Sequence, residues 1–118
     1  MKTKVVYIET EKRNYPLVFN LNVMEEIQEK YGSLDNWGEL TKGNGEEPKI
    51  KELKAGVMFM INEAIDIENE NNNTNEPMVT DKQVGRIMGD VGLDVIVQKI
   101  QEITIASAKS EDNVGKNE

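Results

Sequence analysis

The longest apolar periodicity in the sequence lies between Pro48 and Ile67 and predicts a helix. At about 100° per residue, its apolar residues fall on one helical face: Ile50, Leu53, Val57, Met60, Ile61, Ala64 and Ile67. Pro48 suits the first turn, because the N–H that proline lacks would have no partner there. An apolar stripe of this length makes a mainly helical domain the fold to expect.

A β-hairpin is predicted ahead of this helix. The β-forming residues Val5–Ile8 and Leu17–Phe19 are separated by the polar run Thr10–Asn14. Pro16 has no N–H to donate, so it should lie at the start of the second strand or on an edge. A two-stranded ribbon is only marginally stable alone, and the hairpin must therefore pack on the helices that follow it.

Two shorter helices are expected between the hairpin and the long helix. The first should start near Asn22, whose side chain can accept hydrogen bonds from free N–H groups of the first turn. Gly32 should end this helix as a left-handed cap. A second short helix or turn can run from Ser33 to Leu40, and the glycine-containing segment Thr41–Glu47 is typical of a loop.

Two helices are expected after the long one. The intervening run Glu68–Glu76 is rich in Asn and Glu, with too little apolar surface to offset the entropy of ordering. Thr80 and Gln83 match a capping box, which predicts the start of a short helix that Gly89–Gly92 breaks. The inner face of the final helix is marked by Leu93, Ile96, Val97, Ile100, Ile103 and Ser107.

These elements define the predicted fold class as α+β and mainly α, with an N-terminal β-hairpin packed on a small bundle of four to five helices. A chain of 118 residues suits one domain. We place a single helical domain at residues 1–108 and expect a disordered polar tail at residues 109–118, where nearly all residues are polar.

The charge balance argues against nucleic acid and membranes as partners. The chain has 14 basic and 22 acidic residues, for a net charge of −8. Nucleic-acid binding requires clustered cations that replace counterions on phosphates, and no such cluster is present. An anionic membrane would repel the chain. The apolar stretch Val5–Ile8 is too short for a signal peptide or a membrane span, so we expect a cytoplasmic protein.

The residue types needed for most enzymatic chemistry are missing. The chain contains no cysteine and no histidine, which removes the commonest nucleophile and the commonest general base. No glycine-rich phosphate loop is present either. The adjacent carboxylates Glu25 and Glu26 point about 100° apart on a helix and do not converge on one point. We therefore predict that the protein is not an enzyme and has no cofactor.

One acidic run resembles a metal site in part. Asp66, Glu68 and Glu70 are spaced like the first ligands of a calcium loop. However, Asn71 replaces the glycine of such a loop, and Pro77 stands where the closing glutamate would be. We predict no specific metal site.

Three large side chains are candidates for binding a partner. Phe59 lies about 180° from the centre of the long helix's apolar face, and Met58 lies on the flank of that face. Either another element of the domain covers them, or they form a contact surface for a partner or a second copy. Methionine suits such surfaces because its flexible thioether can repack. Trp37 is either an anchor in or beside the core or part of the same interface.

Taken in order, these features resemble the tail assembly chaperones of long-tailed bacteriophages and prophages of Gram-positive bacteria. The similarity is strongest over residues 15–37, where an apolar strand and an Asn precede an acidic helix that ends at Tyr31-Gly32. Two further stretches are similar to the family: Leu53–Met58 in the long helix, and Thr80–Met88. The last stretch leads into the final helix, and the resemblance as a whole spans roughly residues 4–107; it consists of patterns of residue type rather than a chemical motif.

The resemblance implies a protein that binds the tape-measure protein and keeps it soluble while tail-tube protein subunits assemble around it. It also implies that the chaperone acts in the host cytoplasm and is missing from the mature virion. Family members offer no catalytic residues. Many are also made in a longer, frameshifted form, and codons for Gly115–Asn117 could hold an A-rich slippery site. That is a hypothesis, which a gene lacking a slippery site and an overlapping downstream frame would reject.

Two other classes of function stay open at this point. The chain could be a structural phage component, such as a head–tail connector or minor tail protein. It could also be a small regulator that binds a host protein. Mass spectrometry of purified virions separates the first from a chaperone, because a connector would be present in the particle. A pull-down from host lysate would reveal the second.

Overall fold

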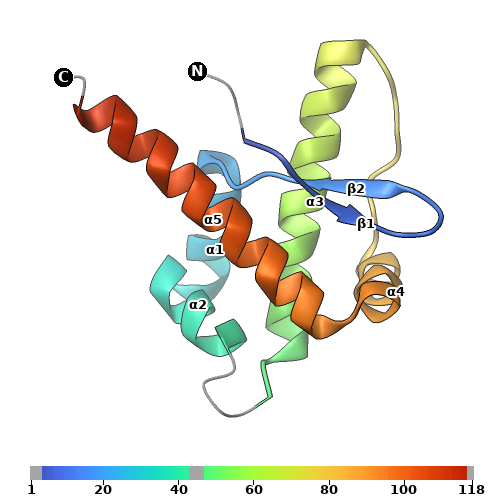
Figure 1. Cartoon of the computed structure of the whole chain (residues 1–118), viewed down its shortest axis with the longest axis horizontal. Coiled ribbons are helices and arrows are strands. Elements are labelled where there is room, and N and C mark those ends of the chain that lie inside the picture. The colour runs from blue at the N-terminus through green and yellow to red at the C-terminus, as the bar shows by residue number, and fades with distance from the viewer. Residues whose placement is uncertain (1–3, 43–46, 117–118) are drawn as a thin grey trace.

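The computed structural model describes residues 4–42 and 47–116, with side chains described as far as residue 107. A two-stranded antiparallel hairpin comes first, and five helices follow in the described part of the chain. The elements, shown in Figure 1, are β1 (Val6–Glu9), β2 (Asn14–Leu17), α1 (Leu21–Tyr31), α2 (Leu34–Lys42), α3 (Ile50–Asn72), α4 (Asp81–Val91) and α5 (Leu93–Lys116). The predicted fold class, α+β and mainly α with an N-terminal hairpin, is confirmed.

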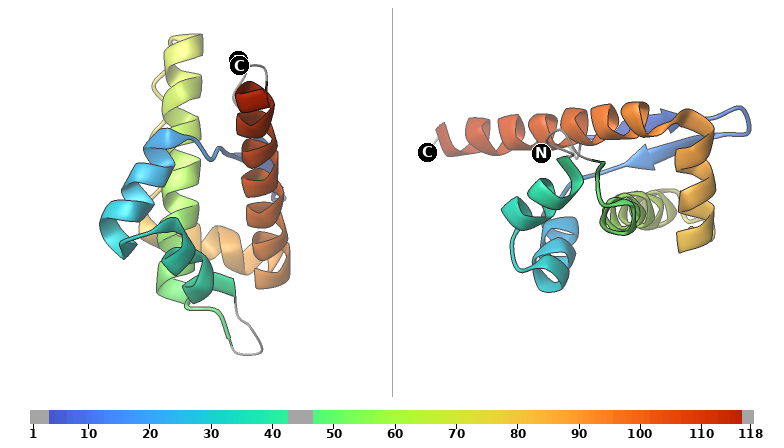
Figure 2. Two further views of the ribbon diagram at one scale, coloured as in Figure 1. Left: turned by 90° about the vertical axis from the view of Figure 1, so that its left-hand side faces the viewer. Right: turned by 90° about the horizontal axis from the view of Figure 1, so that it is seen from below.

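Helix α3 forms the centre of the domain, because β2, α1, α2 and α4 all pack against it (Figure 2). Five residues of its predicted apolar face are buried, namely Leu53, Val57, Met60, Ile61 and Ala64. Ile50 at the first turn is instead exposed, and Ile67 is half-buried. Ala55, Gly56 and Ile65 are buried in addition, since neighbours surround the helix on several sides rather than along one stripe.

The hairpin is held between α3 and α5. Helix α3 packs on β2 and helix α5 packs on β1, as the right-hand view of Figure 2 shows. The register pairs Val6 with Leu17, and both Ile8 and Leu17 are fully buried. The backbone N–H of Val18 also donates to the carbonyl of Met60 on α3. The predicted packing of the hairpin on the helices is thus confirmed.

Helix α1 begins two residues earlier than predicted. Asn20, with extended backbone, is the N-cap, and its side-chain oxygen accepts from the N–H of Val23 at 3.1 Å. The predicted cap, Asn22, lies inside the first turn, and its side chain donates to Glu63 on α3 instead. Gly32 ends the helix with a positive φ of 85°, a conformation that glycine adopts without the penalty of a β-carbon.

Helix α3 starts later and ends later than predicted. Pro48 precedes the helix, because Lys49 is held in an extended conformation with its N–H donating to the carbonyl of Leu40. The helix continues through Glu68 to Asn72 and is capped by Asn73 in the left-handed region. The prediction that residues 68–72 lack regular structure is therefore wrong.

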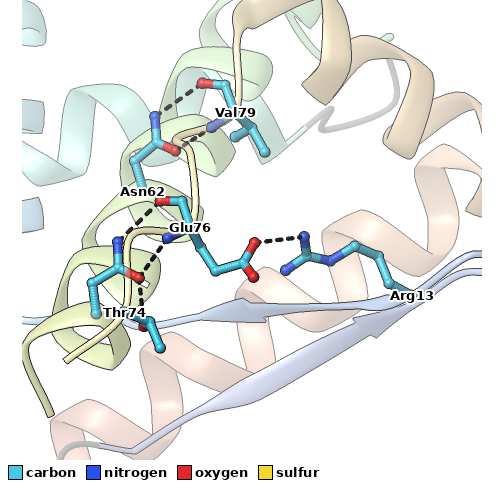
Figure 3. Close-up of polar contacts among 6 residues, drawn as sticks. Arg13, Asn62, Thr74, Glu76 and Val79 are labelled. Carbon is cyan, nitrogen blue, oxygen red and sulfur yellow. Dashed lines mark hydrogen bonds and ion pairs between the residues drawn. The ribbon is translucent and has the colours of Figure 1, made fainter. Parts of the chain in front are cut away.

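The segment after α3 is ordered by amide side chains of the helix itself (Figure 3). Asn62 makes two hydrogen bonds with the backbone of Val79: its amide donates to the carbonyl at 3.1 Å, and its oxygen accepts from the N–H at 2.8 Å. Asn69 bonds in the same two ways with Glu76, at 3.0 and 2.9 Å. These bonds replace the apolar burial that the segment lacks.

Helix α4 begins at the predicted capping box. The hydroxyl of Thr80 accepts from the N–H of Gln83, and the side chain of Gln83 accepts from the N–H of Thr80. Helix α5 starts directly after Gly92 and continues to Lys116, so the boundary predicted at residue 108 is not the end of the helix. Residues 43–46 of the predicted loop, and Asn117 of the frameshift hypothesis, lie outside the described residues.

Candidate functional site

A groove of about 640 Å³ opens between α2 and α5. Its apolar lining comes from four separate parts of the chain: Phe19, Leu34, Trp37, Leu53, Val97 and Ile100. Polar and small residues complete the walls and rim, namely Asp35, Gly38, Glu39, Thr41, Lys42, Gln101 and Thr104. The groove thus combines a mainly apolar lining with access to solvent.

Trp37 fixes the α2 wall of the groove onto α3. Its indole N–H donates to the carbonyl of Glu52 at 2.9 Å, and its ring lies over Gly56. The residue is only 4% exposed, yet it belongs to the groove lining. It therefore acts as a packed anchor from which the groove is built.

The local sequence of α2 places its small and apolar residues on the groove. The hydroxyl of Ser33 caps the helix by accepting from the N–H of Asn36, whose side chain in turn donates to the carbonyl of Tyr31 in α1. Residues 34, 37, 38 and 41 then share one face at helical spacing. Gly38 leaves that face open, because a β-carbon built there would meet no atom within 4 Å.

The opposite wall is one face of α5. Val97, Ile100, Gln101 and Thr104 repeat at spacings of three and four residues and line the groove together. The hydroxyl of Thr104 donates to the carbonyl of Ile100 at 2.9 Å, within the helix. Its hydrogen bonding is thus satisfied without a ligand, and the wall demands no specific polar partner.

The structure does not bring the three predicted binding residues together. Trp37 lines the groove, whereas Phe59 is half-buried against α1, with the ammonium of Lys30 5.9 Å from its ring centre. Met58 is also half-buried and shares its side of α3 with Lys54, which forms an ion pair with Asp81 of α4. Phe59 and Met58 thus face other elements of the domain.

Sequence reasoning missed most of the groove. From the sequence, Phe19 is predicted to lie in a strand, and Leu34, Val97 and Ile100 in helices. None of them is predicted to line a binding site. The available signal was the face that Leu34 and Trp37 share with Gly38 and Thr41 at helical spacing. Nothing in the sequence indicated which face of α5 would lie opposite.

A polar cluster joins α1 to α3 on another part of the surface. One carboxylate oxygen of Glu63 accepts from the side-chain amides of Asn20 at 2.7 Å and Asn22 at 2.8 Å. Burial raises the pKa of nearby Glu26, and the negative charges of Glu63 and two α1 glutamates raise it further. The cluster holds α1 in place, and these contacts suggest no proton-transfer role.

The second hollow and the acidic residues of the domain are less suited to binding a ligand. A second hollow of about 690 Å³, between the hairpin turn and the α4–α5 junction, is lined mainly by charged and polar side chains, including Glu9, Glu11, Asp90 and Lys99. Within the part of the chain that the structure describes, no three acidic residues converge as a metal site. None of the helices there is both long enough and apolar enough to cross a bilayer.

Comparisons with protein-family models, with curated proteins and with solved structures found no match to the chain. The fold and the groove themselves define a class: a small, mainly helical α+β domain with an open apolar groove bounded by two helices. Its mainly apolar lining, with a few polar side chains at the walls and rim, is the kind of surface that binds an apolar segment.

Proposed function

We propose that the protein is a non-catalytic chaperone of phage tail assembly that binds the tape-measure protein while tail-tube protein assembles around it. The observation that carries the proposal is the apolar groove between α2 and α5, together with the sequence resemblance over residues 4–107. In this role the protein acts in the host cytoplasm and is left out of the finished virion.

The shape and chemistry of the groove suit a helical client. A tape-measure protein exposes apolar stripes along its helices, and an amphipathic helix can lay such a stripe into a groove between two helices. Trp37 and Leu53 are buried beneath the groove and hold its half-buried lining in place, so the ordering cost of that surface is met by the fold.

The size of the groove also fits a transient role. A client has to leave the chaperone when the tail tube closes around it. An interface confined to a groove about two helical turns long is far smaller than that of a permanent complex. The interaction is therefore expected to be reversible, with its specificity set by a few apolar side chains.

Co-expression tests this function directly. The full chain is produced together with the tape-measure protein of the same phage, and the soluble fraction of the tape-measure protein is measured after lysis. We expect a severalfold increase over co-expression with an unrelated acidic protein of similar size. An unchanged soluble fraction would contradict the proposal. Detection of the chain in purified virions would instead favour a connector or minor tail protein.

A further inference from the structure

The charges around the groove are unevenly compensated. Its lining contains two carboxylates, Asp35 and Glu39, but one ammonium, Lys42. Lys42 lies 3.9 Å from Glu39 on the same helix. The one lysine of the groove lining is therefore next to a glutamate of its own helix. Asp35 forms no ion pair with any residue that the structure describes.

The groove has the length of a short helical contact. On α5 its lining runs from Val97 to Thr104, which spans roughly 10 Å at 1.5 Å per residue. On α2 it runs from Leu34 to Lys42, or roughly 12 Å. Two helical turns of a client would cover this length, and they would place apolar residues i, i+3 or i+4, and i+7 over the apolar floor.

A second copy of the chain is the poorer occupant on electrostatic grounds. It would bring the same two carboxylates to the same rim, and each copy carries a net charge of −8. Like charges brought together in this way oppose association. A client with basic residues beside its apolar stripe would instead be attracted to the rim.

Resting on the proposed function, we infer that the α2–α5 groove binds a two-turn amphipathic helix whose apolar stripe is flanked by lysine or arginine. The apolar residues of the client lie on the half-buried side chains of Phe19, Leu34 and Val97. A basic residue beside the stripe pairs with Asp35 at the start of α2. The partner is thus defined by chemistry: a basic-flanked amphipathic helical segment.

Trp37 provides the readout, since it is the single tryptophan of the chain and it lines the groove. Tryptophan-free synthetic peptides of about 15 residues, long enough for marginal helix formation, are titrated into the full-length protein. One peptide carries leucines at helical spacing with lysine flanks. A second has glutamates in place of the lysines, and a third is a scrambled version of the first.

The lysine-flanked peptide should change the Trp37 fluorescence saturably and bind about tenfold or more tightly than the glutamate-flanked peptide. Its advantage should shrink as salt is added, because screening weakens exposed charge pairs. Equal or tighter binding of the glutamate-flanked peptide would overturn the inference. So would equal binding of the scrambled peptide, or a concentration-dependent dimer whose formation excludes the lysine-flanked peptide from the groove.

Variants at Gly38 and Asp35 locate the binding. Gly38→Phe projects a ring into the groove and should abolish the response to the lysine-flanked peptide, whereas Gly89→Phe, at an equally open position of α4 outside the groove, should leave the affinity within about twofold. Asp35→Asn should reduce severalfold the ratio by which the lysine-flanked peptide binds more tightly than the glutamate-flanked peptide. Thermal unfolding checks that each variant is folded. Wild-type affinity in folded Gly38→Phe would overturn the placement of the client in this groove.

The same variants separate this inference from the proposed function. If the wild-type chain keeps the tape-measure protein soluble and folded Gly38→Phe does so equally well, the function stands and the groove inference fails. If the wild-type chain binds the lysine-flanked peptide but leaves the tape-measure protein insoluble, the groove inference stands and the proposed function fails.

Discussion

The indole ring of Trp37 occupies the space that a side chain at Gly56 would need. A β-carbon built at Gly56 would lie 2.1 Å from Cζ2 and 2.6 Å from Cε2 of the ring. The indole N–H also donates to the carbonyl of Glu52, one turn earlier on α3. These contacts dock α2 onto α3 and hold one wall of the groove, so the stability of the domain and the shape of its groove depend on the same pair.

Gly56→Ala should therefore destabilise the protein even though alanine favours helices. The new methyl group forces the indole away, and overpacking of this kind costs about 1–3 kcal/mol. Urea unfolding should show a lower midpoint, and the fluorescence of Trp37 should change in the folded state because its hydrogen bond to Glu52 is disturbed.

Gly38→Ala is the matched control for that substitution. Gly38 is also helical, but a β-carbon there meets no atom within 4 Å. This change should raise the free energy of unfolding by about 0.5–1 kcal/mol, the usual gain from replacing glycine within a helix. If both substitutions stabilised the protein, the close packing of Trp37 on Gly56 would be refuted.

The side-chain amide of Asn62 should contribute to the stability of the domain, although its hydrogen bonds are to the backbone of the segment that follows α3. Asn62→Ala removes both hydrogen bonds to Val79 and leaves the backbone N–H of that buried residue without its partner, at a cost of about 2 kcal/mol. Amide hydrogen exchange followed by NMR should show faster exchange at Val79.

Asn71→Ala removes the same side chain at an exposed position about two and a half turns further along α3. Asn71 has no side-chain hydrogen bond to any described residue, so its replacement should change the free energy of unfolding by no more than about 0.5 kcal/mol. Equal losses in the two variants, or unchanged exchange at Val79 in Asn62→Ala, would argue against this anchoring role.

Local signals in the sequence were enough to predict the fold class and several boundaries. The apolar spacing from Leu53 to Ala64 is a property of the helix itself, and Thr80 with Gln83 forms a cap within four residues. Such features depend on neighbours in sequence, which is why they could be read correctly. The start of α1 was misplaced because Asn20 and Asn22 both suit an N-cap, and a tertiary contact of Asn22 with Glu63 decides between them.

The errors after Glu68 have a tertiary origin as well. The Asn-rich composition correctly indicated little apolar burial, but Asn62 and Asn69 lie two turns apart and bond the returning chain through their amides. The groove could not be predicted from the sequence for a related reason. Phe19, Trp37 and Val97 line one surface only once α2, α3 and α5 have packed together, and the spacing of residues in the sequence does not predict how these helices pack.

The capping box of α4 provides a third stability prediction. Thr80→Ala removes the hydroxyl that accepts from the N–H of Gln83 and should cost about 1 kcal/mol, typical of a lost N-cap. Thr80→Ser keeps the hydroxyl and should stay close to the wild type in urea unfolding. A Thr80→Ser variant as unstable as Thr80→Ala would show that the methyl group, and not the cap, matters.

The raised pKa of Glu26 predicts that this side chain opposes folding at neutral pH. Partial desolvation of this exposed side chain is the main cause, and the charges of Glu63, Glu29 and Glu25 add to it, so the folded state binds the proton more tightly than the unfolded state does. The destabilisation is fully present above the raised pKa. It fades as the pH falls through that value toward the ordinary glutamate value of 4.5.

Glu26→Gln should accordingly raise the melting temperature at neutral pH and lose this advantage in mildly acidic buffer. Glu70→Gln removes the same charge at an exposed position of α3 outside the cluster, and so controls for the lower net charge of the chain. The gain of Glu26→Gln over Glu70→Gln, followed by thermal unfolding across the acidic range, isolates the local effect. A gain that is equal in the two variants would assign it to net charge, and one that grows on acidification would contradict the direction of the pKa shift.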